Sequence, residues 1–201
     1  MLDLVLIRAY GKDDGHKTLP LGLLSIATYL QKCGFSVEII DRMRDYQPIA
    51  KCIRNIKGVS PRIIGISALS CQSKDAILLG RKLRETVSAK IIYGGQHFTA
   101  LPSEGLRFGD AVIRNEGEKM VLELCKMDTV NIKGIFEGEA VLNLDEIPLP
   151  SDKMLKDLFQ RGDHFSLVTS RGCYFKCVFC KKVDHDCNVR YHSIEYICDY
   201  I

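Results

Sequence analysis

Residues 62–95 read RIIGISALSCQSKDAILLGRKLRETVSAKIIYGG and contain three successive elements. Arg62–Ser67 and Lys90–Tyr93 are short apolar runs with β-branched residues, which predicts two buried strands. The segment between them, from about Asp75 to Val87, has the length and composition of a helix. A strand, a helix and a strand in this order are typical of two parallel strands joined by a crossover helix.

The same alternation extends in both directions along the chain. We expect further strands at Leu2–Ala9, Ser36–Ile40 and Ala111–Ile113. We expect further helices from Leu23 to Cys33 with Gly34 as the C′ residue, around Ile49–Ile56, and from Glu118 to about Lys126. Because the strands are continuously apolar, both faces of the sheet should be covered by helices. The sequence therefore predicts an α/β fold with a doubly wound, Rossmann-like parallel sheet.

Composition limits the classes of function. The 201 residues suffice for one ordinary α/β domain and a remainder, and 46% hydrophobic residues can form a sizeable core. A formal charge of +3 without a long basic run gives little support for nucleic-acid binding. The sequence contains no apolar stretch of membrane-spanning length and no signal-peptide pattern at its start. We expect a cytoplasmic protein that binds small molecules, neither nucleic acid nor membrane.

The C-terminal part of the chain has a different pattern. Ile132–Leu144 is interpreted as a small hairpin around Glu137–Glu139, followed by an extended connector that contains Pro148 and Pro150. Phe165–Thr169 predicts a new strand, and Ser193 should cap a final helix. The expected domains are a Rossmann-like domain at 1–130, a hairpin and linker at 131–160, and a distinct C-terminal unit at 161–201.

In doubly wound folds, ligands bind outside the carboxyl ends of the strands. The candidate loops are Tyr10–Leu19, Ala68–Gln72, Gly94–Thr99 and Asn115–Glu118. Neither G-x-G-x-x-G nor G-x-x-x-x-G-K-[ST] follows a strand, so ordinary dinucleotide and nucleoside-triphosphate sites lack support. A simpler interpretation stays open: Gly94-Gly95 forms a tight turn, and Glu116 and Glu118 favour a helix N-terminus.

The cysteines fall into two groups. Of the nine, four are scattered through apolar segments and are interpreted as small buried hydrophobic residues: Cys33, Cys52, Cys71 and Cys125. Three others form a C-x3-C-x2-C pattern just after a predicted strand: Cys173, Cys177 and Cys180. Three thiolates on one compact loop suggest a four-iron cluster that leaves one iron open to another ligand. Cys187 and Cys198 are interpreted as incidental.

A structural zinc site is the main alternative for this loop. His185 or Cys187 could add a fourth ligand to the three thiolates in a closed tetrahedral site. Unliganded surface thiols are a further alternative. Against zinc, the loop lacks the paired C-x2-C spacing of common structural zinc sites. The aromatic residues Tyr174, Phe175 and Phe179 also suit a loop that faces a cofactor.

The C-x3-C-x2-C loop, with an aromatic residue before its third cysteine, resembles the radical S-adenosylmethionine enzymes. The resemblance implies that Cys173, Cys177 and Cys180 bind a 4Fe-4S cluster and that Phe179 lies beside the adenine of S-adenosylmethionine. In that family the cofactor chelates the open iron, and an electron from the cluster cleaves its sulfonium. The products are methionine and a 5′-deoxyadenosyl radical.

The front of the chain carries a second resemblance. Leu19–Gly22, Gly65–Ser67, Gly94–His97, Asn115–Glu118 and Asp145–Pro148 occur in the order seen in radical enzymes with an N-terminal cobalamin-binding domain. This likeness implies that cobalamin contacts Ser67, Ala68, Ser70, Gly94, Gly95, His97 and Glu116. A cobalt-binding D-x-H-x-x-G motif is incomplete, because Leu19 stands where glycine is expected, so His16 is not expected to bind cobalt.

The segment Phe165–Ile201 is short for a catalytic barrel. A complete eight-unit barrel takes about 250 residues, whereas this segment offers one strand, the cysteine loop and one helix. We expect a truncated barrel, and three interpretations stay open: a fragment, a truncated gene product, or half of a split enzyme that a second polypeptide would complete. The predicted function is therefore a fragment of a cobalamin-dependent-type radical S-adenosylmethionine enzyme, whose relatives perform methyl transfer or radical rearrangement. The alternative is a corrinoid-binding module with structural zinc.

Overall fold

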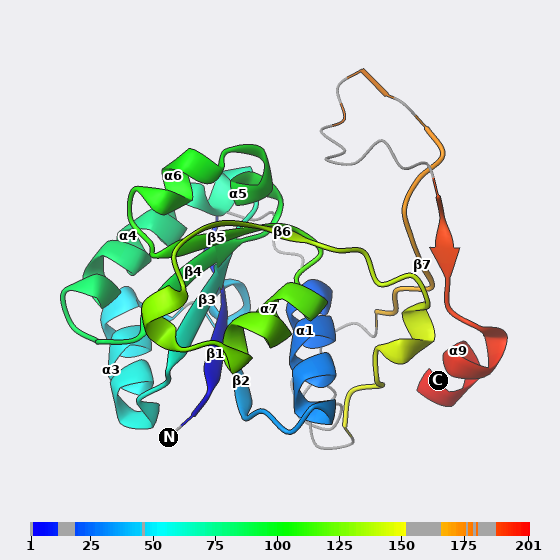
Figure 1. Ribbon diagram of the computed structural model, residues 1–201, viewed down its shortest axis with the longest axis horizontal. Coiled ribbons are helices and arrows are strands. Elements are labelled where there is room, and N and C mark those ends of the chain that lie inside the picture. Colours follow the sequence, from blue (N-terminus) through cyan, green and yellow to red (C-terminus); the bar gives the residue numbers. More distant parts are fainter. Residues whose placement is uncertain are drawn as a thin grey trace.

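The computed structural model describes residues 2–11, 19–45, 47–151, 166–175, 177–178, 180 and 188–201. A six-stranded parallel sheet in the order β2-β1-β3-β4-β5-β6 runs through its centre (Figure 1). Its strands are β1 (Leu4–Arg8), β2 (Val37–Asp41), β3 (Ile63–Ser67), β4 (Lys90–Gly94), β5 (Ala111–Asn115) and β6 (Gly134–Gly138). The predicted doubly wound α/β fold is confirmed.

Side chains alternate between the two faces of the sheet and so form two cores. In β1, Leu4 and Leu6 belong to one buried cluster, and Val5 and Ile7 belong to the other. Successive residues of a strand point to opposite faces, so a strand buried on both faces needs an uninterrupted apolar run. The buried residues of β1 therefore explain why its sequence shows no polar alternation.

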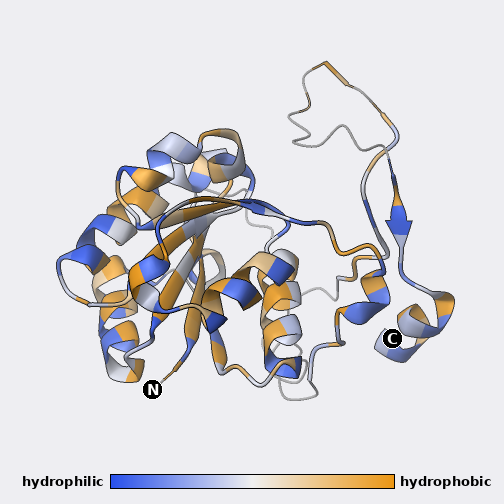
Figure 2. Ribbon diagram, viewed as in Figure 1, coloured by the Kyte–Doolittle hydropathy of each residue, from blue (hydrophilic) through white to orange (hydrophobic). Residues whose placement is uncertain are grey.

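Helices cover both faces (Figure 1). One face carries α1 (Leu21–Lys32) and α7 (Glu118–Lys126). The other carries α3 (Ile49–Val59), α4 (Ser73–Arg84), α5 (Gln96–Ala100) and α6 (Pro102–Leu106). A short α2 (Arg42–Asp45) follows β2. Figure 2 shows hydrophobic colour concentrated on the strands and on the helix faces that meet them, as expected for a layered fold.

The end of α1 follows the predicted signal. Gly34 has φ +87°, and its N–H donates to the carbonyl of Gln31. Glycine takes this left-handed conformation without the steric cost that a side chain imposes, which is why it commonly follows a helix end. The chain can therefore turn at once towards β2.

The hairpin predicted for Ile132–Leu144 is wrong. Gly134–Gly138 forms β6, which pairs in parallel with β5 along the edge of the same sheet. Residue Ile132 is completely buried in the core beneath α7. Because α7 supplies the crossover between β5 and β6, the strand arrives in parallel and has no hairpin partner. The sheet consequently extends beyond residue 130.

The C-terminal segment departs from expectation in one respect. Residues 166–169 form no strand, and Phe165 lies outside the described residues. Instead, β7 (Ser170–Arg171) pairs in antiparallel fashion with β8 (Arg190–Tyr191). The predicted final helix is confirmed as α9 (Ile194–Tyr200), and Ser193 caps it by accepting the N–H of Tyr196 at 3.1 Å. A short 3₁₀ helix, Thr129–Asn131, connects α7 to β6. Another, Leu144–Glu146, precedes the linker.

None of the helices within the described ranges is both long and apolar enough to cross a membrane.

Candidate functional site

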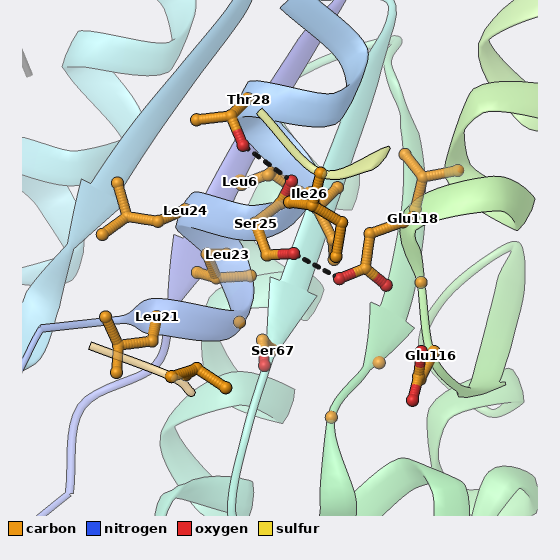
Figure 3. A pocket seen from close by; sticks show the side chains of 18 of the residues that line it. Leu6, Leu21, Leu23, Leu24, Ser25, Ile26, Thr28, Ser67, Glu116 and Glu118 are labelled. Atoms are coloured by element: carbon orange, nitrogen blue, oxygen red, sulfur yellow. Dashed lines mark hydrogen bonds between the residues drawn. The ribbon is translucent and has the colours of Figure 1, made fainter. Parts of the chain in front are cut away.

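A cavity of about 430 Å³ lies between the sheet and the helices α1 and α7. Its apolar floor comes from strand residues on the α1 side of the sheet: Leu4, Leu6, Ile92 and Ile113. Leu21–Ile26 of α1 form one wall, and Figure 3 shows these side chains grouped beside the cavity. This size lies within the range of about 300–1,000 Å³ typical of small-molecule sites.

Two glycines that line the cavity have different roles. Gly94 lies on the same face of β4 as Ile92, and a Cβ there would meet only the carbonyl oxygen of Ile113, at 3.6 Å. Gly95 has φ +87°, and a Cβ would lie 2.7 Å from Oγ of Ser67. The loops after β3 and β4 therefore approach closely only because residue 95 lacks a side chain.

An unsatisfied acceptor stands among the residues lining this cavity. Asn115, the last residue of β5, has φ +65°. Its Oδ1 is buried and has no hydrogen-bond partner among the described residues. A buried polar atom without a partner costs about 1–3 kcal/mol. A ligand that donates a hydrogen bond here would remove that cost.

The carboxylate of Glu116 binds two arginines from the C-terminal segment. It accepts from Arg171 at 3.2 Å, from both terminal nitrogens of Arg190, and from the N–H of Val141 at 3.0 Å. Burial opposes ionisation of Glu116, but the hydrogen bonds from Arg190 and Val141 and the charge of Arg171 outweigh it. The pKa of Glu116 therefore lies below its ordinary value.

Glu118 links the same segment to α1. It is only 2% exposed, and it accepts from Oγ of Ser25 at 2.5 Å and from Nη2 of Arg171 at 2.8 Å. Figure 3 shows Ser25 and Glu118 pointing toward one another at the cavity. Burial disfavours the charge of Arg171, but the nearby carboxylate of Glu118 outweighs it and raises the pKa of Arg171. We call Ser25, Glu116, Glu118, Arg171 and Arg190 the glutamate–arginine clasp.

The linker and α9 supply the outer wall. Ile147, Pro148 and Pro150 line the cavity together with Tyr196 and Tyr200. Burial raises the pKa of Tyr196 to about 12, so this phenol is uncharged at neutral pH.

Asp145 holds this outer wall in place. Its carboxylate accepts from Nδ1 of His192 at 3.0 Å and from the N–H of Ser193 at 3.1 Å. The hydrogen bonds from Ser193 lower the pKa of Asp145, and His192 adds to the effect. The linker segment Asp145–Pro148 thus has a structural role at the start of α9.

The structure places four of the predicted cobalamin contacts in the cavity lining: Ser67, Gly94, Gly95 and Glu116. Three others lie outside that lining: Ala68, Ser70 and His97. The ring of His97 is nearly buried, with Nδ1 3.2 Å from Oγ of Ser70 and Nε2 3.1 Å from Glu104. His97 therefore fixes the loop that follows β3. Phe179 and His16 lie outside the described residues.

Cys173, Cys177 and Cys180 are exposed on the segment between β7 and β8. Across the described ranges, no three His, Cys, Asp or Glu side chains converge as a metal-binding group. The two residues weighed as a fourth zinc ligand, His185 and Cys187, are outside those ranges.

The scattered cysteines divide into two pairs. Cys52 and Cys125 are buried as predicted, and burial raises the pKa of their thiols to about 11 and about 12. Cys33 and Cys71 are exposed, so the prediction that they are buried is wrong. Cys33 lies just past the end of α1, and Cys71 lies in the turn before α4, where the chain is at the surface.

Several site residues were missed from the sequence. Arg171, Arg190 and Ser25 were given no role at the cavity, and Glu118 was expected only as a member of the candidate loop Asn115–Glu118 or as a residue that favours a helix start. A weak signal exists, because Arg171 and Arg190 flank the cysteine loop and two glutamates follow a strand end at Asn115–Glu118. Nothing in the sequence shows which charges meet, since the pairs are separated by 53 to 74 residues.

Comparison with protein families finds one match in the region that forms the cavity. Residues 7–125 match the family model described as the B12 binding domain. That range begins within β1, contains β2 to β5 in full and ends within α7.

Individual relatives point in the same direction. The uncharacterized methyltransferase PH0819 of Pyrococcus horikoshii is 31% identical over 90% of this chain and 44% of its own length. The 4′-phospho-dehydrooxetanocin synthase of Priestia megaterium is also 31% identical, over 83% of this chain and 26% of its own length. The chain therefore spans less than half the length of both relatives.

Solved structures of cobalamin-dependent radical enzymes share the fold. OxsB, solved with aqua-cobalamin and S-adenosylmethionine bound, superimposes with a TM-score of 0.82 at 22% identity, over 99% of this chain and 31% of OxsB. TsrM from Kitasatospora setae, solved with cobalamin and a [4Fe-4S] cluster, gives 0.73 at 18% identity, over 100% of this chain and 45% of TsrM.

Proposed function

The chain belongs to the B12-binding domain family, and from this premise we propose that it binds a cobalamin in the cavity between the sheet and α1. We propose further that Cys173, Cys177 and Cys180 hold a 4Fe-4S cluster that binds S-adenosylmethionine. The chain would then form the cofactor-binding front part of a cobalamin-dependent radical enzyme of the methyl-transfer or rearrangement type.

The cavity is the observation that carries the cobalamin proposal. It is lined mainly by aliphatic side chains, and its lining includes the carboxyl-terminal residues of β3, β4 and β5. A cobalamin has a flat aromatic base on a flexible tail and a broad corrin ring, so the base would suit the apolar floor. The corrin would lie over the strand ends, where doubly wound folds bind their ligands.

The residues at the opening have distinct tasks in this proposal. Gly94 would let the tail pass close to the backbone, because a side chain there would meet only the carbonyl oxygen of Ile113, and Gly95 would hold the loops after β3 and β4 together. Oδ1 of Asn115 would accept a hydrogen bond from the ligand. Bound here, a cobalamin would supply a cobalt that can carry a methyl group. The protein would orient it and exclude water from its tail.

The cluster proposal is supported by the donor set. Three exposed thiols on one short loop are the ligand type that iron–sulfur clusters use. The exposed aromatic side chains of Tyr174 and Phe175 accompany them. TsrM, which shares the fold, was solved with such a cluster. In this proposal the three thiolates would come together only when iron binds, because metal binding and the ordering of its ligands are coupled.

A substitution in the cavity tests the cobalamin proposal. Gly94→Val adds a side chain to the open part of the cavity without left-handed strain, since the φ of Gly94 is not positive. In optical titration with methylcobalamin, we expect the wild-type chain to bind and this variant to bind at least about tenfold more weakly. Gly58→Val, an exposed position of α3 with open space around it, is the matched control. Equal binding by wild type and Gly94→Val would contradict the assignment of the cavity.

Anaerobic reconstitution with iron and sulfide tests the cluster. The wild-type chain should take up about four irons and four sulfides, and Cys177→Ala should lose most of them. Cys33→Ala, at an exposed cysteine outside the loop, is the control. Uptake of one zinc per chain in preference to iron would instead support a structural zinc site.

A further inference from the structure

The glutamate–arginine clasp joins three parts of the molecule that are distant in sequence. Ser25 lies on α1, Glu116 and Glu118 lie at the junction of β5 and α7, and Arg171 and Arg190 lie on β7 and β8. Each arginine reaches the same carboxylate, Glu116, and the carbonyl oxygen of Val141 also accepts from Arg190. The segment that carries the cysteines is therefore fastened at both of its ends to one residue of the cavity.

The two arginines differ in their relation to the cavity. Arg171 lines it, and Arg171 stands two positions before Cys173. Arg190 is not among the described lining residues. It does form an ion pair with the carboxylate of Glu116, and Glu116 lines the cavity. A ligand in the cavity can thus touch Arg171 and Glu116 directly, while Arg190 can feel that ligand only through Glu116.

The charged side chains of the clasp are largely shielded from solvent. The side chains of Arg171, Arg190 and Glu116 are 19%, 15% and 22% exposed, and Glu118 is 2% exposed. Charged hydrogen bonds in such surroundings are stronger than neutral ones and fix side-chain orientation. Removal of one partner from a buried ion pair also destabilises the folded protein, because it leaves a buried charge without compensation. The β7–β8 pair should therefore dock in one defined position when the clasp is complete.

We propose that the clasp couples occupancy of the cavity to the docking of the β7–β8 pair, with Arg190 as a positioning residue. This inference rests on the proposed binding of cobalamin in the cavity. A ligand that packs against Glu116 and Arg171 favours the clasped arrangement, and the clasped arrangement completes the cavity wall through Arg171 and α9. By thermodynamic linkage, the two effects are equal. The factor by which the bound ligand raises the equilibrium constant for docking of the β7–β8 pair is the factor by which docking raises the affinity for the ligand.

The arrangement has a consequence for the cysteines. Their loop begins just after Arg171 and ends just before Arg190, so a docked β7–β8 pair fixes both ends of the loop relative to the cavity. Docking of the β7–β8 pair would therefore fix where the segment that carries the cysteines starts and ends relative to the cavity.

Arg190→Gln tests the proposal, because it alters the clasp without altering the described cavity lining. We expect it to weaken methylcobalamin binding about tenfold in the full 201-residue chain, within the range typical of coupling between sites. Arg190→Lys keeps the charge but loses the two-nitrogen contact, and should fall between wild type and Arg190→Gln. Arg81→Gln, on α4 across the sheet, is the matched control and should bind as wild type does.

Hydrogen exchange of the amides in residues 189–193 gives a second readout. In the wild type, methylcobalamin should slow their exchange, and in Arg190→Gln this ligand-dependent slowing should be lost. A merely structural role would speed exchange equally with and without ligand and leave the dissociation constant unchanged, which would overturn the proposal. If the wild-type chain binds no methylcobalamin, the proposed function fails as well. If it binds and Arg190→Gln binds equally, only the coupling fails.

Discussion

At the level of single residues, Glu116 combines the most roles. It lines the cavity, accepts hydrogen bonds from two arginines and one backbone N–H, and keeps its charge despite partial burial. A neutral amide in its place would retain one acceptor oxygen and present an N–H₂ group to two guanidinium groups. Glutamine at this position would therefore place an N–H₂ donor against guanidinium donors, where the carboxylate of Glu116 accepts hydrogen bonds from them.

We therefore predict that Glu116→Gln lowers the free energy of unfolding by about 1–2 kcal/mol at pH 7, the worth of charged hydrogen bonds at a partly exposed site. The pKa of Glu116 is lower in the folded chain than its ordinary value of 4.5. The stabilisation is consequently complete above pH 4.5 and is lost as pH falls through the folded value. Urea denaturation of both proteins between pH 7 and pH 3 should show the gap shrinking on the acid side.

The control for this prediction is Glu123→Gln, an exposed carboxylate on α7 that pairs with Lys126 in the same helix turn. Exposed pairs of this kind contribute little. A gap of the same size for both variants, or one that is constant with pH, would show that Glu116 has no special role.

At the level of elements, α9 shows how a short helix is fixed at the surface. It spans only seven residues, and none of its side chains is fully buried. A helix so short is marginal by itself in water, so it depends on its cap and on its docking. Ser193 accepts the N–H of Tyr196, and Asp145 accepts the N–H of Ser193.

We predict that Ser193→Ala destabilises the start of α9 by about 1 kcal/mol, because the N–H of Tyr196 loses its acceptor. Hydrogen exchange at Tyr196 should become about fivefold faster, while amides in the central strands keep their rates. Ser88→Ala, at an exposed loop serine before β4, should leave α9 unchanged. Unchanged exchange at Tyr196 in Ser193→Ala would show that the cap contributes nothing.

At the level of the whole molecule, the cavity is a gap in an otherwise closely packed layer between the sheet and α1. Protein interiors are normally filled to the density of organic crystals, so a large cavity lined by aliphatic groups gives up contacts that a ligand would restore. A ligand that binds the folded chain and not the unfolded chain also stabilises it by mass action.

We predict that methylcobalamin at 100 times its dissociation constant raises the free energy of unfolding by about 2.7 kcal/mol. The gain in the free energy of unfolding can be measured by urea denaturation followed by circular dichroism. Tryptophan fluorescence cannot be used, because the chain contains no tryptophan. Gly94→Val should show no comparable gain, and Gly58→Val should show the full gain. A gain of the same size in Gly94→Val would place the ligand elsewhere on the protein.

The sequence by itself determined five of the six strands and the helices α1, α3, α4 and α7, and it carried the resemblance to cobalamin-binding domains. Continuous apolar strands such as Leu4–Ile7 separated by helical segments have few alternatives, because both faces of every central strand must be buried. Glycine positions carried the same information locally: Gly34 ends a helix, and Gly95 permits the close approach of two loops. These signals are short-range, so they can be recognised without knowing the tertiary structure.

Only the tertiary structure decided the course of β6 and the contact of the C-terminal segment with the cavity. The parallel course of β6 depends on where α7 carries the chain, which the Gly- and Glu-rich sequence near Glu137 does not reveal. The pairing of Glu116 with Arg190 joins residues 74 positions apart. Charge pairs carry no periodicity and depend on distance in space, so the fold had to form before the clasp could be identified.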